Sequence, residues 1–173
     1  ASFLLGKAYL NGENVEKSIS EAIKWYEMSI EEGYICAAFA LGNLYYEGKE
    51  VPKDDKKAVE IWTKEKMEGR WEDDCAKDSY SAFKNFEALA TAQPKEYAYK
   101  LGMLCYEGEC NRVNPDVDPV GTYNPSSYSA KEWLEKAFEV GNADAAYYLG
   151  HLYSDFSMAG SGWDLTDSDP SLP

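Results

Sequence analysis

Residues 38–69 read AFALGNLYYEGKEVPKDDKKAVEIWTKEKMEG, and the spacing within this stretch decides the fold. Leu41-Gly42 is followed by Tyr45 and then by Gly48, at intervals of three residues. The same spacing begins 36 residues earlier, at Leu5. Self-similarity at a fixed period of this length is typical of proteins built from stacked helix pairs. Further copies of the Leu-Gly pair are Leu101-Gly102 and Leu149-Gly150.

A second column of residues shares this register. An alanine stands eleven residues before a glycine in three places: Ala22 before Gly33, Ala58 before Gly69, and Ala130 before Gly141. Apolar residues around both columns recur at the three- and four-residue spacing of an amphipathic helix. The repeat therefore predicts pairs of helices. A glycine inside the first helix of each pair suits the close approach of a neighbouring helix.

Boundary residues predict where these helices begin and end. Ser18 with Glu21, and Ser129 with Glu132, have the spacing of capping boxes. Asp54, Pro94 and Asn142 suit helix starts, and Gly33, Gly69 and Gly141 suit left-handed helix ends. The expected helices lie near residues 2–11, 18–32, 36–47, 54–68, 79–92, 95–107, 129–140 and 143–155.

Together these columns resemble the Sel1-like repeat, a relative of the tetratricopeptide repeat. The best match is Ala38-x-x-Leu41-Gly42-x-x-Tyr45-x-x-Gly48-x-x-Val51-x-x-Asp54-x-x-Lys57-Ala58-x-x-x-Trp62, closing at Gly69. The resemblance covers residues 2–155 and is clearest at 34–69. It implies an all-α, right-handed superhelical solenoid of antiparallel helix pairs, as used in adaptor, assembly and host-interaction proteins. The motif residues are structural in that family, so no active site comes with the resemblance.

Departures from the period predict the domain organisation. Thirteen residues separate Gly69 from Ala82, where 25 separate Gly33 from Ala58, so a unit near 70–93 is degenerate. A proline-containing insertion at 109–128 precedes the last helix pair. We expect the solenoid to span 1–156, followed by an irregular tail at 157–173. Trp163 in that tail leaves open whether it is disordered or covers the last repeat.

The charge of the chain bears on its partners. With 31 acidic and 17 basic residues the net charge is −14, which repels nucleic-acid phosphates and attracts a basic partner. Solubility alone is an equally good reason for an acidic surface. No apolar run approaches the roughly 20 residues of a membrane-spanning helix, so we expect no membrane insertion. Because no Met comes first, we expect a fragment or a processed product.

The four cysteines predict little cross-linking. They show no paired C-x-x-C spacing, so neither a structural zinc site nor the disulfide framework of a small secreted fold is expected. Cys105 and Cys110 remain candidates for a bond across a helix end, which leaves the redox compartment open. The four positions are Cys36, Cys75, Cys105 and Cys110.

Few residues suggest a catalytic or metal-binding site. His151 is the single histidine, without a nucleophile signature elsewhere, and a lone helical histidine is mostly a packing or surface residue. Asn114, Asp116 and Asp118 alternate as calcium ligands do, but Pro119 stands where a calcium loop needs glycine. We therefore expect no catalytic residue, no metal and no cofactor.

A second face of each first helix is a better candidate for binding. Residues two before, two after and five after the motif leucine project about 140–200° away from it. In helix-pair solenoids this face lines a concave groove that binds peptides or partner loops, and aromatic residues and Met suit that role. The alternative is that these side chains pack one first helix against the next. The candidates are Phe39, Asn43, Tyr46, Tyr99, Met103, Tyr106, Tyr147 and His151.

The sequence therefore favours a non-catalytic scaffold or adaptor that binds a peptide segment or an enzyme surface of another protein. The alternative is an immunity or inhibitor protein that neutralises a basic toxin or effector enzyme. Its motivation is the acidic charge and the irregular insertion, and the resembled family includes such antidotes. An enzyme acting on cell-envelope material is the least favoured hypothesis. We expect a soluble protein of the bacterial cytoplasm or periplasm, with no indication of its oligomeric state.

Overall fold

All secondary structure in the described part of the chain is α-helical. The computed structural model describes residues 2–64, 76–107 and 126–159. In these ranges all eight expected helices are present, which confirms the all-α prediction. They are α1 (Ser2–Asn11), α2 (Ile19–Glu31), α3 (Ile35–Glu47), α4 (Asp55–Lys64), α5 (Ala76–Ala92), α6 (Pro94–Tyr106), α7 (Ser126–Glu139) and α8 (Asp144–Ala159).

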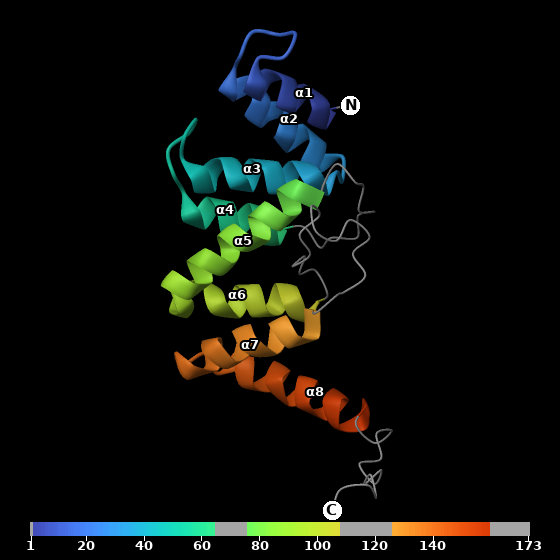
Figure 1. Cartoon of the computed structure of the whole chain (residues 1–173), viewed down its shortest axis with the longest axis vertical. Coiled ribbons are helices and arrows are strands. Elements are labelled where there is room, and N and C mark those ends of the chain that lie inside the picture. The colour runs from blue at the N-terminus through green and yellow to red at the C-terminus, as the bar shows by residue number, and fades with distance from the viewer. Residues whose placement is uncertain (1, 65–75, 108–125, 160–173) are drawn as a thin grey trace, which may run out of the picture.

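The helices stack along the long axis of the molecule, with α1 and α8 at opposite ends (Figure 1). Each of the first four helices packs on its neighbour in sequence, and so do α6, α7 and α8. The exception is α5, which packs against α3 and α6 and barely contacts α4. It runs diagonally across the stack (Figure 1). In the sequence this unit is shorter than the others, with 13 rather than 25 residues from its glycine to its alanine, and α5 packs on α3 directly.

Glycines with positive φ close the turns of the repeat. Gly12 and Gly48 end first helices at φ 75° and 66°, a region that residues with a side chain rarely adopt. In both turns the carbonyl of the motif tyrosine then accepts a hydrogen bond from the residue that caps the next helix. Ser18 N donates to Tyr9 O at 3.0 Å, and Asp54 N donates to Tyr45 O at 3.0 Å. The repeated sequence thus makes a repeated turn.

The motif glycines inside helices allow close packing, as expected. A Cβ built on Gly6 would lie 2.6 Å from the ring of Tyr26, and one on Gly102 would lie 2.9 Å from Leu134. A Cβ on Gly42 would collide with the indole of Trp62. Gly150 is the exception, since nothing in the described part of the chain lies within 4 Å of its Cβ position.

Three of the expected helix boundaries are wrong, one of them the start of α5, which begins at Ala76 rather than at residue 79. Ser129 does not cap α7, which begins three residues earlier at Ser126, and Ser129 is fully buried. α8 continues to Ala159, beyond the expected boundary of the tail at residue 157. Other boundaries are confirmed: Ser18 Oγ accepts from Glu21 N at 3.4 Å, and Asn142 Oδ1 accepts from Ala145 N at 3.2 Å.

Several expectations concern residues that lie outside the described ranges. These are most of the insertion at 109–128 with its alternating Asn and Asp residues, Gly69, Cys75, Cys110, and the tail from 160 onward. Within the described ranges, no helix combines the length and the apolarity needed to cross a lipid bilayer.

Candidate functional site

Two of the candidate binding residues, both on α3, are buried. Phe39 is 4% exposed and belongs to the core, and Asn43 is 9% exposed. Asn43 Nδ2 donates to the backbone oxygen of Asp78 at 3.0 Å, while Asn85 Nδ2 donates to Asn43 Oδ1 at 3.1 Å. Both partners lie on α5. Asn43 therefore holds α3 to α5, and Phe39 is part of the core, which agrees with the packing alternative for both residues.

Tyr46 lies in a different environment. Its ring is half-buried and meets the indole of Trp62 at a centroid distance of 6.0 Å. The ammonium of Lys53 lies 4.7 Å from its centroid. Trp62 and Lys53 of the same chain therefore already contact the ring of Tyr46. Tyr46 is separate from the candidates on α6 and α8.

The candidates on α6 and α8 come together around a tyrosine that the sequence did not single out. Tyr148 makes ring contacts with Tyr106 at 5.1 Å, Tyr147 at 5.2 Å and Tyr99 at 6.4 Å. Tyr147 in turn meets His151 at 4.7 Å. We call Tyr99, Tyr106, Tyr147 and Tyr148 the tyrosine cluster.

Exposure changes across the tyrosine cluster. Tyr99, Tyr106 and Tyr148 are half-buried and pack against the core, as Met103 does on α6. Tyr147 is 65% exposed, the most exposed large apolar side chain among the described residues, and His151 is also exposed. The cluster therefore has a base fixed by packing and an outer ring in solvent. An aromatic side chain such as Tyr147, supported by packed neighbours, loses little conformational entropy when it binds.

Burial and neighbouring groups keep the hydroxyl of Tyr99 protonated. Desolvation is the largest cause of its raised pKa, followed by Tyr148, Asp144 and a hydrogen bond with Tyr148. The carboxylate of Asp144, at the start of α8, is thus close enough to act on the cluster. The cluster offers π surfaces, hydroxyl groups and one nearby negative charge.

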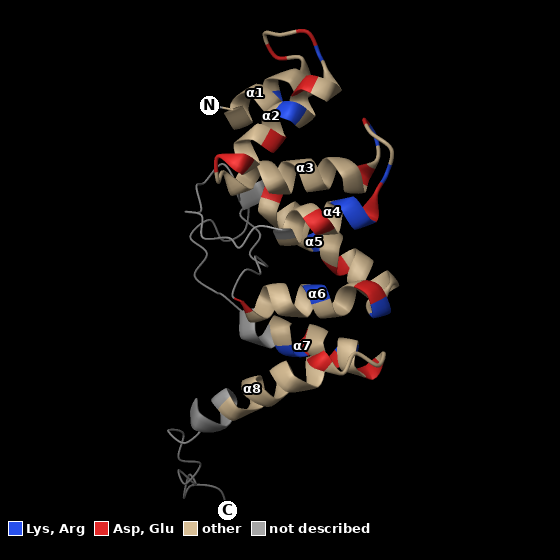
Figure 2. Cartoon of the chain, turned by 180° about the vertical axis from the view of Figure 1, so that it is seen from behind, with Lys and Arg blue, Asp and Glu red and all other residues tan. Residues whose placement is uncertain are grey.

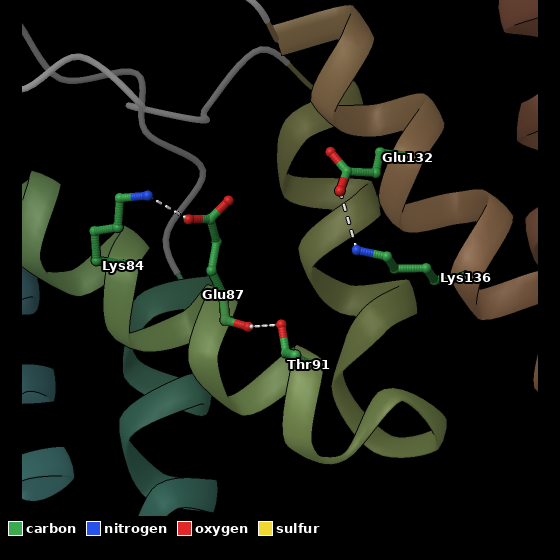
Figure 3. A network of polar contacts seen from close by, with 5 residues as sticks. All are labelled: Lys84, Glu87, Thr91, Glu132 and Lys136. Carbon is green, nitrogen blue, oxygen red and sulfur yellow. Dashed lines mark hydrogen bonds and ion pairs between the residues drawn. The ribbon is translucent and has the colours of Figure 1, made fainter.

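Charged groups elsewhere pair both within single helices and between elements, as Lys7 of α1 does with Asp78 of α5. Figure 3 shows Lys84 paired with Glu87 at 2.8 Å in α5, and Lys136 paired with Glu132 at 3.0 Å in α7. Such pairs contribute roughly 0.3–0.5 kcal/mol each. Acidic positions are spread along the stack with basic ones among them (Figure 2). The described residues hold no group of three or more His, Cys, Asp or Glu placed to bind a metal ion.

The cysteines differ from the sequence expectation. Cys36 on α3 and Cys105 on α6 are both disulfide-bonded, and each is 1% exposed. The other two cysteines, Cys75 and Cys110, lie outside the described residues, so the pairing of Cys105 with Cys110 stays a prediction. The bond at Cys105 is compatible with the pairing considered from the sequence, whereas no bond was expected at Cys36.

Comparisons with known proteins agree with the repeat. The family model of the Sel1 repeat matches residues 1–34, 37–64, 95–119, 121–142 and 143–158. Helix α5 lies in the unmatched stretch between residues 64 and 95. The cluster residues Tyr99, Tyr106, Tyr147 and Tyr148 all lie in matched segments.

A curated relative and two solved structures are similar to the chain. An exopolysaccharide production negative regulator of Rhizobium leguminosarum bv. viciae is 22% identical over 188 residues, a match that covers 92% of this chain and 63% of that protein. The chain thus spans less than two thirds of that relative's length. A Sel1 repeat protein from Oxalobacter formigenes is 27% identical, with 87% and 86% of the two chains covered and a TM-score of 0.33. A protective antigen of uropathogenic Escherichia coli strains, which displays an SLR fold, is 25% identical, with 90% and 33% covered and a TM-score of 0.36.

Proposed function

Because the chain belongs to the Sel1 repeat family, we propose that it is a non-catalytic scaffold that binds another protein through the tyrosine cluster of α6 and α8. One observation carries the proposal: Tyr147 is 65% exposed although its ring contacts both Tyr148 and His151. Large aromatic side chains that protrude from a rigid base are the residues that dominate protein interfaces.

The location of the cluster supports this proposal. The corresponding face of α3 is covered by α5, through Asn43 and its partners Asp78 and Asn85. The face of α6 and α8 carries half-buried and exposed rings instead. Partner binding is therefore assigned to the C-terminal half of the stack. A groove running along every first helix is not required.

The curated relative supports a regulatory use of such binding. It is named as a negative regulator of exopolysaccharide production. A scaffold regulates by holding another protein in a given place or state, which needs a contact surface and no chemistry. We extend only the mode of action to this chain, namely regulation of another protein by binding.

The test compares partner capture by two alanine variants of the same helix. Tyr147→Ala with His151→Ala removes the exposed part of the site. Tyr153→Ala is the matched control, since Tyr153 is 50% exposed on the same helix but is held by Glu135 at 2.7 Å. Immobilised protein is exposed to extract of the source cells, and the captured proteins are quantified by mass spectrometry. Circular dichroism checks that helicity is retained.

We expect the double variant to lose a partner that the wild type and the Tyr153→Ala protein both retain. Hot-spot aromatic residues cost about 2 kcal/mol or more on truncation, which is roughly a thirtyfold loss of affinity. Equal capture by all three proteins would show that the partner binds elsewhere.

The net charge of −14 favours a second candidate, an inhibitor or immunity protein that covers a basic enzyme. Electrostatic steering of this kind raises association rates at low salt. Association with the isolated partner should then slow by more than tenfold between about 0.05 and 0.5 M salt. A rate that does not depend on salt would rule out steering by the acidic surface.

The two disulfide-bonded cysteines support action in an oxidising compartment such as the bacterial periplasm. Disulfides persist in such compartments and are rare in the cytosol. Thiol labelling of the protein in whole cells tests this. Because both cysteines are buried, the cells are lysed into denaturant that contains the label and no reductant, and labelling of Cys36 and Cys105 under these conditions would place the protein in a reducing compartment.

A further inference from the structure

Lysine side chains lie over aromatic rings in much of the described chain. The Lys136 ammonium lies 4.0 Å from the ring centroid of Trp133, and the Lys57 ammonium lies 4.1 Å from that of Tyr45. Cation–π contacts usually occur about once per 70–80 residues, so six among the described residues is a high number. The remaining pairs are Lys7 with Phe3, Lys53 with Tyr46, Lys84 with Tyr80, and Lys131 with Tyr153.

Among the described residues, the tyrosine cluster has no such cation. In the described residues, no lysine lies over Tyr99, Tyr106, Tyr147 or Tyr148. Helix α8 contains no Lys or Arg over its whole length, from Asp144 to Ala159. The exposed part of the cluster belongs to this helix, so α8 itself supplies no cation to those rings.

The rings stand at steep angles to one another. Tyr147 and Tyr148 meet at an interplanar angle of 87°, Tyr106 and Tyr148 at 69°, and Tyr147 and His151 at 69°. Rings in this relation present π faces in more than one direction, and the face of an aromatic ring is its electronegative side. Tyr147, which is largely exposed, offers such a surface to solvent.

The charge near the cluster also favours a cation. Asp144 is an exposed carboxylate that acts on Tyr99, and the net charge of the chain is −14. A planar guanidinium stacks on aromatic rings and pairs with a carboxylate in the same contact, more effectively than an ammonium does. The cluster and Asp144 together fit that combination.

Resting on the proposed function, we propose that the tyrosine cluster of α6 and α8 receives an arginine side chain from a basic segment of the partner. The guanidinium lies against Tyr147 and its neighbouring rings, and Asp144 supplies the counter-charge. Arginine is thus the residue of the partner that the site recognises.

A pair of short peptides tests the proposal without the natural partner. Tetra-arginine is titrated into the protein by isothermal calorimetry at low salt, next to tetra-citrulline, which keeps the shape of the side chain and lacks its charge. The variants are Tyr147→Leu, Tyr147→Phe and Asp144→Asn. The control is Tyr153→Leu, because the ring of Tyr153 lies under Lys131 at 4.8 Å.

We expect Tyr147→Leu to weaken tetra-arginine binding about two- to fivefold, as for an exposed cation–π contact. Tyr147→Phe retains binding because the ring is retained, Asp144→Asn weakens it, and Tyr153→Leu binds as the wild type does. Tetra-citrulline binds weakly to all of them. Equal weakening by the Tyr147→Leu and Tyr153→Leu variants would overturn the proposal, since general attraction to an acidic surface would then explain it. Citrulline binding equal to that of arginine would overturn it as well, in favour of a neutral apolar segment.

These outcomes are distinct from those of the proposed function. If Tyr147→Ala with His151→Ala abolishes partner capture while tetra-arginine binds wild type and Tyr147→Leu alike, the surface is right and the recognised residue is wrong. If capture is unaffected but tetra-arginine binding depends on Tyr147, the site binds arginine and the partner uses another surface.

Discussion

At the scale of single residues, two motif glycines differ in the space around them. Gly42 packs under Trp62, so a Cβ there would lie 2.8 Å from Cε2 of the indole and nearer still to other ring atoms. Trp62 is 2% exposed and cannot move aside without disturbing the core. Gly150 has open space at the same motif position. The same repeat position is therefore tightly packed in one unit and open in another.

We expect Gly42→Ala to destabilise the protein by about 1–3 kcal/mol, because the overpacking exceeds the gain in helix propensity. Gly150→Ala should stabilise it by up to about 1 kcal/mol, since propensity acts there without a clash. Urea unfolding of both variants and the wild type gives the comparison. Stabilisation by both substitutions would mean that the Trp62 side chain can shift to accommodate the added methyl group.

The raised pKa of Tyr26 leads us to expect a loss of stability at alkaline pH. Burial, with a smaller effect of the Asp78 carboxylate, raises the pKa of Tyr26 above its ordinary value of 10.0. Below that pH the hydroxyl is protonated in the folded and the unfolded chain, so the shift has no effect. Above it the unfolded chain releases a proton that the folded chain retains, and stability falls as the pH rises.

Replacing Tyr26 with Phe should therefore flatten the alkaline decline by up to about 1.4 kcal/mol per pH unit. Part of the decline remains, because the pKa values of Tyr97 and Tyr99 are also raised by burial. The urea midpoint measured from about pH 9 to 11 gives the slope. Identical slopes for the two proteins would show that Tyr26 ionises freely in the folded state.

At the scale of elements, α5 is the helix that departs from the repeat. It docks on α3 through a hydrogen-bond chain in which Asn85 donates to Asn43 and Asn43 donates to Asp78 O. Its apolar residues Phe83 and Phe86 are buried in the core. The polar chain specifies how α5 lies on α3, while the apolar residues supply most of the burial.

Asn43→Ala should cost about 1–3 kcal/mol, because two polar groups lose their partner inside this interface. In a double-mutant cycle with Asn85→Ala, the two losses should add up to more than the loss in the double variant. Asn11→Ala is the control, since its hydrogen bond to Glu13 is exposed and should contribute little. Additive losses in the cycle would mean that the two amides act independently.

At the scale of the whole molecule, the disulfides connect to helices in different halves of the stack. Cys36 lies on α3 and Cys105 on α6, and both are buried. Complete reduction should lower the free energy of unfolding by about 2–5 kcal/mol per native bond. The thermal midpoint measured with and without reductant, with thiol labelling to confirm reduction, checks this. An unchanged midpoint in fully reduced protein would contradict a stabilising role.

The candidate site was predictable only in part. Tyr99, Tyr106, Tyr147 and His151 follow from position relative to the motif leucine, and ring contacts through Tyr148 and Tyr147 bring them together. Tyr148 was missed because it lies one residue before the motif leucine, outside the three offsets considered. Phe39 and Asn43 have the same offsets as the others and are buried, Phe39 in the core and Asn43 against α5.

By itself the sequence determined the eight helices and the turns between pairs. These depend on local rules: apolar spacing within a helix, a capping side chain at its start, and a glycine with positive φ at its end. The tertiary structure decided which surface stays free. The shortened unit lets α5 pack on α3, so identical repeat positions become core on α3 and exposed surface on α8. Exposure depends on the neighbouring helix, and no rule of spacing along the chain reports where that helix packs.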